Sequence, residues 1–362
     1  MGMADDAADV SRETRSPLAG FSVRTAADVD ESSPQTGLAD DNTPLARAVA
    51  HELLVREGRS YGDPMERPSR TRVLVVANQK GGVGKTTTTV NIAAGLAQLG
   101  QRVLVIDLDP QGNASTALSV DHHRGTPSTY DVLVDGVPLE EVIAPAGSVP
   151  GLFVVPATID LAGAEIELVS VVARESRLRK ALAAHPGIDT GLEVGHRVSE
   201  DRFDFVIIDC PPSLGLLTLN ALVAGAEMLI PIQAEYYALE GLGQLLETVD
   251  MVKAHLNQAL VVSTILITMY DGRTKLAAGV ADEVRGHFGS KVLRTNIPRS
   301  VRVSEAPSYG QSVMTYDPGS SGALSYLEAA RELALQGKRP RPPRPPGPRQ
   351  MPPGPAMRTG EA

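Results

Sequence analysis

The chain has 362 residues, of which 42% are hydrophobic and 21% charged, and its formal net charge is −9. This length suffices for one large α/β domain with a sizeable core. No stretch reaches the roughly 18 uninterrupted apolar residues of a membrane span, because Asn220 and Glu227 interrupt the longest apolar region. The single cysteine, Cys210, excludes an internal disulfide and a metal site made of cysteines.

The N-terminal region falls into two parts. Residues 1–42 are rich in Ala, Asp, Ser and Thr and show no hydrophobic periodicity, which predicts a disordered acidic extension. Acidic residues stand where a signal peptide has basic ones, so we expect a cytoplasmic protein. Residues 43–70 comprise a short helix and a polar linker, with Thr43 as N-cap and Pro44 at the first helical position. The apolar side of that helix either packs on the core or binds a partner.

Between residues 71 and 336, short apolar runs alternate with helical patterns. The runs are continuous and rich in β-branched residues, which is typical of strands covered on both faces. This region is therefore predicted to be one α/β domain, a doubly wound, mostly parallel sheet with helices on both faces and ligands at the carboxyl ends of its strands. Residues 337–362 are rich in Pro and Arg and are predicted to form a disordered tail. The predicted strands are 73–77, 103–107, 152–156, 205–209, 228–232 and 261–268, and the predicted helices include 86–99, 161–184, 216–225, 239–254 and 275–288.

A glycine-rich loop follows the first predicted strand and leads into a helix. Small residues there let backbone N–H groups surround a triphosphate, and the N-terminus of the helix adds positive potential. Lys85 is expected to neutralise phosphate oxygens, and the Thr86 hydroxyl to ligate Mg²⁺. Gln79 stands where the common pattern has glycine, so the loop departs from the standard motif. The candidate ATP-binding residues of the loop are Lys80, Gly81, Gly82, Val83, Gly84, Lys85, Thr86 and Thr87.

A second lysine, Lys80, precedes the glycines of this loop. The segments KGGVGKTTT, DLDPQGN and DCPPSLGLLT resemble the deviant Walker A ATPases of the MinD/ParA superfamily and are most similar to the ParA/Soj chromosome-partitioning family. The resemblance extends over about 71–336 and implies a deviant P-loop NTPase fold with weak, Mg²⁺-dependent ATP hydrolysis. It also implies that Lys80 is catalytic and reaches the phosphates of the neighbouring subunit in an ATP-sandwiched homodimer.

Carboxylates stand at the ends of two predicted strands. Asp209 ends the run FVIID, an arrangement that places a carboxylate near Mg²⁺. Asp107 and Asp109 stand at the end of the 103–107 strand. A carboxylate there has one of two roles: it orients or deprotonates the attacking water, or it caps the following helix. The resemblance assigns the catalytic role to Asp109. Cys210 lacks the thiolate partners that a metal or redox role requires.

The resemblance also carries residues outside the loop. The segment NIPRS resembles the adenine-side loop of the family, with Pro298 and Ser300 at nucleotide-contacting positions, although the family commonly has Asn where Ser300 stands. Arg273 and Arg302 match positions used for sequence-independent DNA binding, in which guanidinium groups contact phosphates without reading bases. From the sequence alone, a surface arginine is usually just a solvated charge, and it is the resemblance that favours a functional role for these two.

Together these features predict an ATP-driven chromosome-partitioning protein that is cytoplasmic and nucleoid-associated. The resemblance implies that the ATP-bound dimer binds double-stranded DNA non-specifically and is released when a ParB-like centromere-binding protein stimulates hydrolysis. One alternative is a MinD-like membrane-cycling ATPase, which needs a C-terminal amphipathic helix, whereas the proline-rich tail predicts no stable membrane anchor. Another is a ParA-like positioning factor for a non-DNA cargo, in which the N-terminal extension binds a polar or division protein.

Overall fold

The computed structural model describes residues 64–147, 149–190, 201–235 and 242–336. The chain divides into two units, Met1–Thr43 and Pro44–Ala362, and all described residues belong to the second. The predicted acidic extension, the helix that begins at Pro44 and the proline-rich tail lie outside the described residues. Their boundaries therefore stay predictions.

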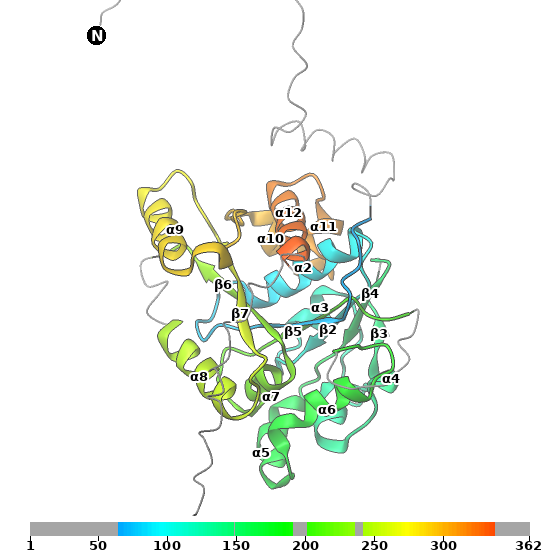
Figure 1. Ribbon diagram of the computed structural model, residues 1–362. Helices are drawn as coiled ribbons and strands as arrows, with labels where there is room; N and C mark the ends of the chain where they lie inside the picture. Colours follow the sequence, from blue (N-terminus) through cyan, green and yellow to red (C-terminus); the bar gives the residue numbers. More distant parts are fainter. Residues whose placement is uncertain (1–63, 148, 191–200, 236–241, 337–362) are drawn as a thin grey trace, which may run out of the picture. The chain divides into compact units, whose positions relative to one another are not determined.

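A seven-stranded sheet forms the centre of the fold, in the order β3-β4-β2-β5-β1-β6-β7 (Figure 1). Every pairing is parallel except that of β3 with β4. All residues of β2 and β5 are buried, as expected for strands that have helices on both faces. The strands are β1 (Arg72–Val76), β2 (Val103–Asp107), β3 (Ala144–Pro145), β4 (Leu152–Val155), β5 (Phe205–Asp209), β6 (Glu227–Gln233) and β7 (Val261–Thr268).

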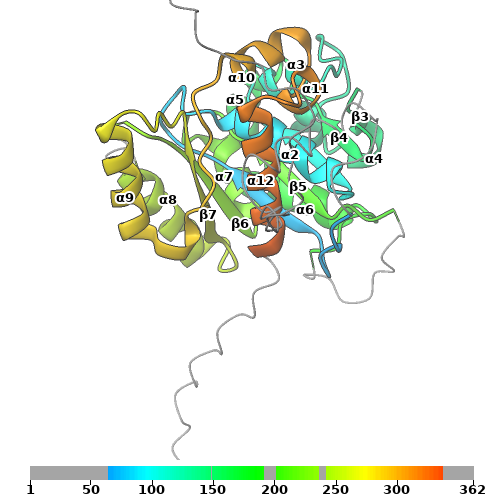
Figure 2. The same ribbon diagram turned by 90° about the horizontal axis from the view of Figure 1, so that it is seen from above.

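Helices cover both faces of this sheet (Figures 1 and 2). Successive strand residues point to opposite faces: Leu74 of β1 packs in the cluster with α2 and α12, and Val75 in the cluster with α7, α8 and α9. The predicted fold class, a doubly wound and mostly parallel α/β sheet, is confirmed. The helices are α2 (Lys85–Gln98), α3 (Asn113–Ala117), α4 (Leu139–Val142), α5 (Leu161–Glu167), α6 (Arg177–Ala184), α7 (Leu216–Ala224), α8 (Leu242–His255), α9 (Lys275–Phe288), α10 (Val301–Glu305), α11 (Val313–Tyr316) and α12 (Ser321–Gln336).

One predicted helix, 161–184, is wrong as a continuous element. The structure divides it into α5, two short 3-10 turns and α6, and Ala173 between the turns has a φ of 55°. That left-handed conformation breaks the helical path. The preceding run from Val169 to Val172 contains three β-branched valines, whose restricted side chains weaken the helix. The two-residue strand β3 was not predicted because it is too short to show a pattern, and α12 was not among the predicted helices.

His185, directly after α6, is a buried imidazole that we expect to make stability depend on pH. Its Nδ1 accepts a hydrogen bond from Gly187 N–H at 2.9 Å, and burial lowers its pKa. Below the ordinary histidine pKa of about 6.5 the unfolded chain therefore binds the proton more readily than the folded chain. The free energy of unfolding contributed by His185 is fully present above that pH and is lost as the pH falls.

Urea denaturation at about pH 7.5 and about pH 5.5 measures this loss. His185→Gln should reduce the difference in unfolding free energy between the two pH values, because glutamine does not titrate. His123→Gln, which replaces an imidazole that is 90% exposed, serves as the control and should leave the difference as in the wild type. An equal difference in all three chains would contradict the assignment.

Candidate active site

Three segments that follow β1, β2 and β5 meet at one edge of the sheet. β5 lies between β1 and β2, and Asp209 at its end is in register with Val76 of β1 and Asp107 of β2. Because these strands are parallel, the loops after all three open on the same side. A cavity of about 630 Å³ lies there, bounded by the glycine-rich loop, the first turns of α2, the segment after β2 and Pro212 after β5.

The glycine-rich loop faces open space. Gly82 and Gly84 have φ values of 74° and 88°, a left-handed conformation that glycine adopts without steric cost. A Cβ added at Gly81, Gly82 or Gly84 would meet no atom within 4 Å. The loop therefore leaves room for a ligand directly against its backbone. Because α2 begins at Lys85, its N-terminal N–H groups and dipole add the positive potential that suits a phosphate.

Lys85 lies between the loop and two carboxylates. Its side chain is largely buried, and its Nζ is 3.4 Å from the carbonyl oxygen of Lys80. Burial lowers the pKa of Lys85, and the nearby Asp209 and Asp109 carboxylates oppose that shift. A cation held in this way beside the glycine-rich loop is suited to neutralise phosphate oxygens.

Asp209 is fully buried and incompletely hydrogen-bonded. Thr89 Oγ1 donates to its Oδ1 at 2.8 Å, whereas its buried Oδ2 has no hydrogen-bond partner in the described part of the chain. Burial, and next the Asp107 carboxylate, raise the pKa of Asp209 to about 8 against the opposing hydroxyls of Thr86 and Thr89. A buried carboxylate oxygen without a partner is expensive unless a cation neutralises it. The residues present therefore fit a hard cation such as Mg²⁺, which uses one or two protein ligands and completes its shell with water and phosphate oxygens.

The two acids after β2 have different surroundings. Asp107 is completely buried and accepts hydrogen bonds from the backbone N–H and hydroxyl of Ser115 at 2.9 and 2.7 Å. Its neighbour Asp109 lines the cavity, and its Oδ1 is oriented by the N–H of Gln111 at 3.0 Å. Asp107 thus holds the start of α3 in place, whereas Asp109 is placed to contact a bound ligand.

The adenine-side residues taken from the resemblance lie apart from this cavity. Pro298 forms an isolated parallel bridge with Tyr270, and Ser300 directly precedes α10. Neither borders the cavity, which Met269 and Pro307 border instead. Met269 follows the predicted strand 261–268 at its carboxyl end, so the rule that found Asp109 also points to it. Pro307 carries no motif that the sequence analysis could have used.

Lys80 does not border the cavity. Its Nζ is 3.3 Å from Glu235 Oε2, just after β6. The two lysines of the loop therefore have different environments within one chain. The structure places Lys85 at the cradle and Lys80 outside it.

The two arginines matched to DNA-binding positions are exposed and paired with acids. Arg273 donates to Asp271 at 2.9 and 2.8 Å. Arg302 on α10 lies 3.1 Å from Glu305 and 3.3 Å from Asp317. Each is close in sequence to a residue that borders the cavity: Met269 precedes Arg273, and Pro307 follows Arg302.

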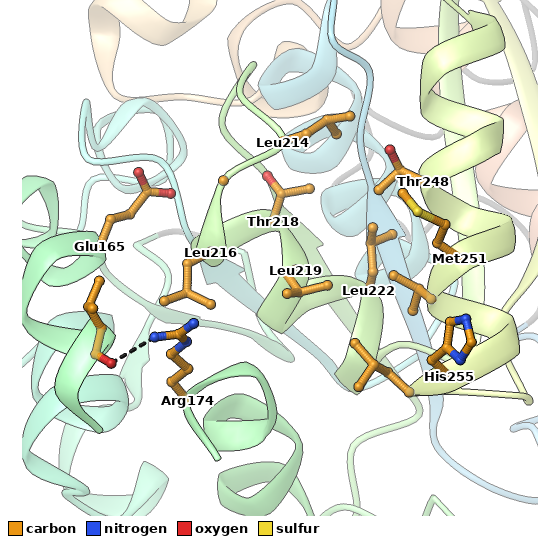
Figure 3. Close-up of a pocket in the computed structure, with 14 residues that line it drawn as sticks. Glu165, Arg174, Leu214, Leu216, Thr218, Leu219, Leu222, Thr248, Met251 and His255 are labelled. Atoms are coloured by element: carbon orange, nitrogen blue, oxygen red, sulfur yellow. Dashed lines mark hydrogen bonds between the residues drawn. The ribbon is translucent and has the colours of Figure 1, made fainter. Parts of the chain in front are cut away.

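A second cavity, of about 720 Å³, lies between α5, α7 and α8 (Figure 3). Its walls are mainly leucines of α7, with Met251 of α8 opposite, and the Arg174 at its side donates to Val169 O at 2.7 Å. The glycine-rich loop and the acids Asp109 and Asp209 do not line it. No cluster of His, Cys, Asp and Glu that could hold a metal ion occurs among the residues described. Within the same ranges, no helix has the length and apolar character needed to cross a membrane.

Comparison with known proteins shows the family of the chain. The AAA domain family model matches residues 71–262. Sporulation initiation inhibitor protein Soj of Bacillus subtilis (strain 168) is 50% identical over 266 residues, which cover 74% of this chain and 99% of Soj. Chromosome partitioning protein ParA of Myxococcus xanthus (strain DK1622) is 48% identical over 262 residues, 72% of this chain and 87% of that protein.

Solved structures share the fold. One is the crystal structure of cobyrinic acid a,c-diamide synthase from Mycobacterium smegmatis with bound ATP analog and magnesium. Its sequence is 39% identical and its TM-score is 0.61, and the match covers 75% of this chain and 97% of that one. The septum site-determining protein MinD of Pyrococcus horikoshii OT3 with Mg-ADP is 24% identical with a TM-score of 0.56, and the match covers 73% of this chain and 96% of that one. It therefore supports the fold alone.

The sheet, the phosphate cradle and the adjoining carboxylates define a P-loop ATPase of the doubly wound class. Within that class, the identity to Soj and ParA over nearly their full length shows that the chain belongs to the Soj/ParA family of chromosome-partitioning ATPases. The resemblance found in the sequence is confirmed.

Proposed function

We propose that this chain is a nucleotide-driven DNA-segregation switch. ATP and Mg²⁺ bind in the cavity, the ATP-bound chains form a sandwich dimer, and the dimer binds duplex DNA without reading its sequence. Hydrolysis then releases the DNA. In this proposal Lys85 and Thr86 hold phosphate and Mg²⁺ together with Asp209, and Asp109 orients the attacking water.

The observation that carries the proposal is the convergence of three strand ends on one cavity. The glycine-rich loop after β1 has open space against its backbone, and Asp109 after β2 borders the same cavity. Asp209 at the end of β5 has a buried oxygen without a partner in the described ranges. Phosphoryl transfer depends mainly on positioning and charge compensation, and this arrangement provides groups for both. The solved relative with an ATP analog and magnesium supports the same pair of ligands.

The surroundings of the cavity support a slow basal rate and stimulation by a partner. No arginine of the described segments borders the cavity, so these segments supply no arginine to neutralise charge that develops in the transition state. We therefore expect weak turnover that a ParB-like centromere-binding protein accelerates. The names of the Soj and ParA relatives support a role in chromosome partitioning. In the cell the protein is then cytoplasmic and associated with the nucleoid.

DNA binding is proposed for the exposed arginines near the cavity. Arg273 and Arg302 lie in segments that also contribute Met269 and Pro307 to the nucleotide site, so a bound nucleotide can alter the position of both. Each arginine already has carboxylate partners, and DNA phosphates must compete with them. Such binding is weak in one chain and benefits when a dimer joins two sets of arginines.

Fluorescence anisotropy of a random-sequence duplex, with ATP or ADP, tests the proposal. We expect ATP-dependent, sequence-independent binding that weakens steeply with salt. Arg302→Ala should reduce the slope of log affinity against log salt by about one for each arginine lost, hence about two in a dimer. Arg179→Ala is the matched control, because that arginine contacts Leu256 O at 3.2 Å, beside the second cavity, and its loss should leave DNA binding unchanged.

The two alternative functions, a membrane-cycling ATPase and a positioning factor for another cargo, predict different results. A membrane-cycling ATPase would co-sediment with anionic liposomes in ATP and ignore DNA. A positioning factor for another cargo would be captured by its partner through residues 1–70 alone. Absence of DNA binding in ATP at low salt would overturn the segregation switch.

A further inference from the structure

Lys80 has a partner within its own chain. Its ammonium lies 3.3 Å from Glu235 Oε2, and the two side chains are 38% and 47% exposed. The cavity beside it is bordered by Lys85 and not by Lys80. In a single chain, therefore, Lys80 is bound to a carboxylate and does not contact the chain's own nucleotide site.

The position of Glu235 leaves one of its oxygens for this contact. Its backbone N–H donates to Gln233 O at 2.8 Å. Gln233 Nε2 donates to Oε1 at 2.5 Å, and Arg299 Nη2 lies 3.8 Å from the same oxygen. Oε1 therefore lies near one amide donor and one guanidinium, and Oε2 is the atom that faces Lys80.

The backbone of Lys80 is attached to the same strand as Glu235. Its N–H donates to Asn78 Oδ1 at 3.0 Å, and Asn78 Nδ2 donates to Pro231 O of β6 at 2.8 Å. Glu235 comes two residues after β6 ends at Gln233. The backbone of Lys80 is thus linked through Asn78 to β6, the strand that Glu235 follows.

We propose that Glu235 is a positioning residue that holds Lys80 in the single chain and must release it before Lys80 reaches the nucleotide of a second copy. This inference rests on the proposed nucleotide-dependent dimer. The ammonium exchanges one carboxylate for the more highly charged phosphates, so the exchange is favourable only when ATP is in place. Glu235 then opposes dimerisation without ATP and sets the concentration at which ATP-bound chains associate.

The size of the effect follows from the exposure of the pair. Exposed ion pairs contribute little, and two of them break when one dimer forms. Removing the Glu235 charge should therefore lower the dimer dissociation constant in ATP roughly 2- to 30-fold. The affinity of a single chain for ATP should change far less, because Glu235 does not border the cavity.

The experiment compares the full-length wild type, Glu235→Gln, Arg299→Gln and Glu283→Gln by sedimentation velocity with Mg²⁺ and a non-hydrolysable ATP analogue. Arg299→Gln removes the other cation near Glu235 but leaves Lys80 bound, so it should not strengthen the dimer. Glu283→Gln removes the same charge from an exposed position on α9 and controls for net charge. A second variant, Glu235→Ser, and thermal melting of each chain show that the effect does not come from misfolding.

ATP turnover gives a readout that a purely structural role would not change. Glu235→Gln should exceed the wild type at low protein concentration and converge with it at saturating concentration, where both chains are dimeric. Lys80→Ala should form no ATP-dependent dimer. A wild type that dimerises with the same dissociation constant as Glu235→Gln overturns the inference and leaves the proposed function standing. No dimer in either chain overturns both, and a dimer in Glu235→Gln alone supports the inference.

Discussion

Replacing Asp109 with asparagine should lower ATP turnover by roughly a hundredfold or more, while the affinity for ATP stays close to that of the wild type. Asp109 borders the cavity and is oriented by Gln111 N–H. Asparagine has the same shape and still accepts that hydrogen bond, but it cannot take a proton from water or bear the charge that orients it. Single-turnover phosphate release measures the chemical step, and a fluorescent ATP analogue measures binding.

Asp107 is the matched control for this variant. It stands two residues away, at the same end of β2, but is enclosed and bonded to Ser115. Asp107→Asn should lower the free energy of unfolding, because the amide cannot accept all of these hydrogen bonds. Normal turnover in Asp109→Asn, or a larger loss of single-turnover rate in a folded Asp107→Asn chain, would remove Asp109 from the catalytic role.

Replacing Asp209 with asparagine should have two effects of opposite sign. Nucleotide affinity and turnover should lose most of their dependence on Mg²⁺, because the carboxylate that would neutralise the cation is gone. The nucleotide-free chain should become more stable, by about 1–3 kcal/mol, because a buried charge with an unsatisfied Oδ2 disappears. Thermal or urea unfolding in EDTA at pH above about 8, the value to which the pKa of Asp209 is raised, measures the second effect.

Asp204 provides the contrast. It is as completely buried as Asp209, but it accepts hydrogen bonds from Arg67 Nε at 2.7 Å and from Arg102 N–H at 2.9 Å. Asp204→Asn should therefore destabilise the chain, since it removes the negative charge that the buried ion pair with Arg67 requires. If both variants changed stability in the same direction, the surroundings of Asp209 would not have the metal-binding character assigned to them.

The sheet and much of the site could be predicted from sequence because their signals are local. Each strand that borders the site is a continuous apolar run, and the rule that ligands bind at carboxyl ends places Asp109 and Asp209 next to the glycine-rich loop. In the structure Asp109 borders the same cavity as the loop, and Asp209 lies near enough to Lys85 to influence its pKa. Lys85 followed from the same loop, because its place at the start of α2 is fixed by sequence spacing.

What could not be predicted depends on tertiary contacts. The pairing of Lys80 with Glu235 joins residues of two loops that follow different strands, β1 and β6, and no pattern links them in the sequence. The acids beside Arg302 are Glu305 at the end of α10 and Asp317 directly after α11, so charge composition alone did not show that this arginine is paired. Pro298 and Ser300 were placed by resemblance and lie outside the cavity borders, and their nucleotide contacts remain a prediction.

The buried cysteine gives the nucleotide site a built-in chemical reporter. Cys210 is the only cysteine of the chain, it directly follows Asp209, and burial raises the pKa of its thiol well above the ordinary value. Because the thiol is buried, reagents can reach it only when the chain around the end of β5 opens. The rate of modification therefore reports the free energy of that opening. Dyes attached through a cysteine introduced on the surface would likewise label one position, without first removing the native thiol.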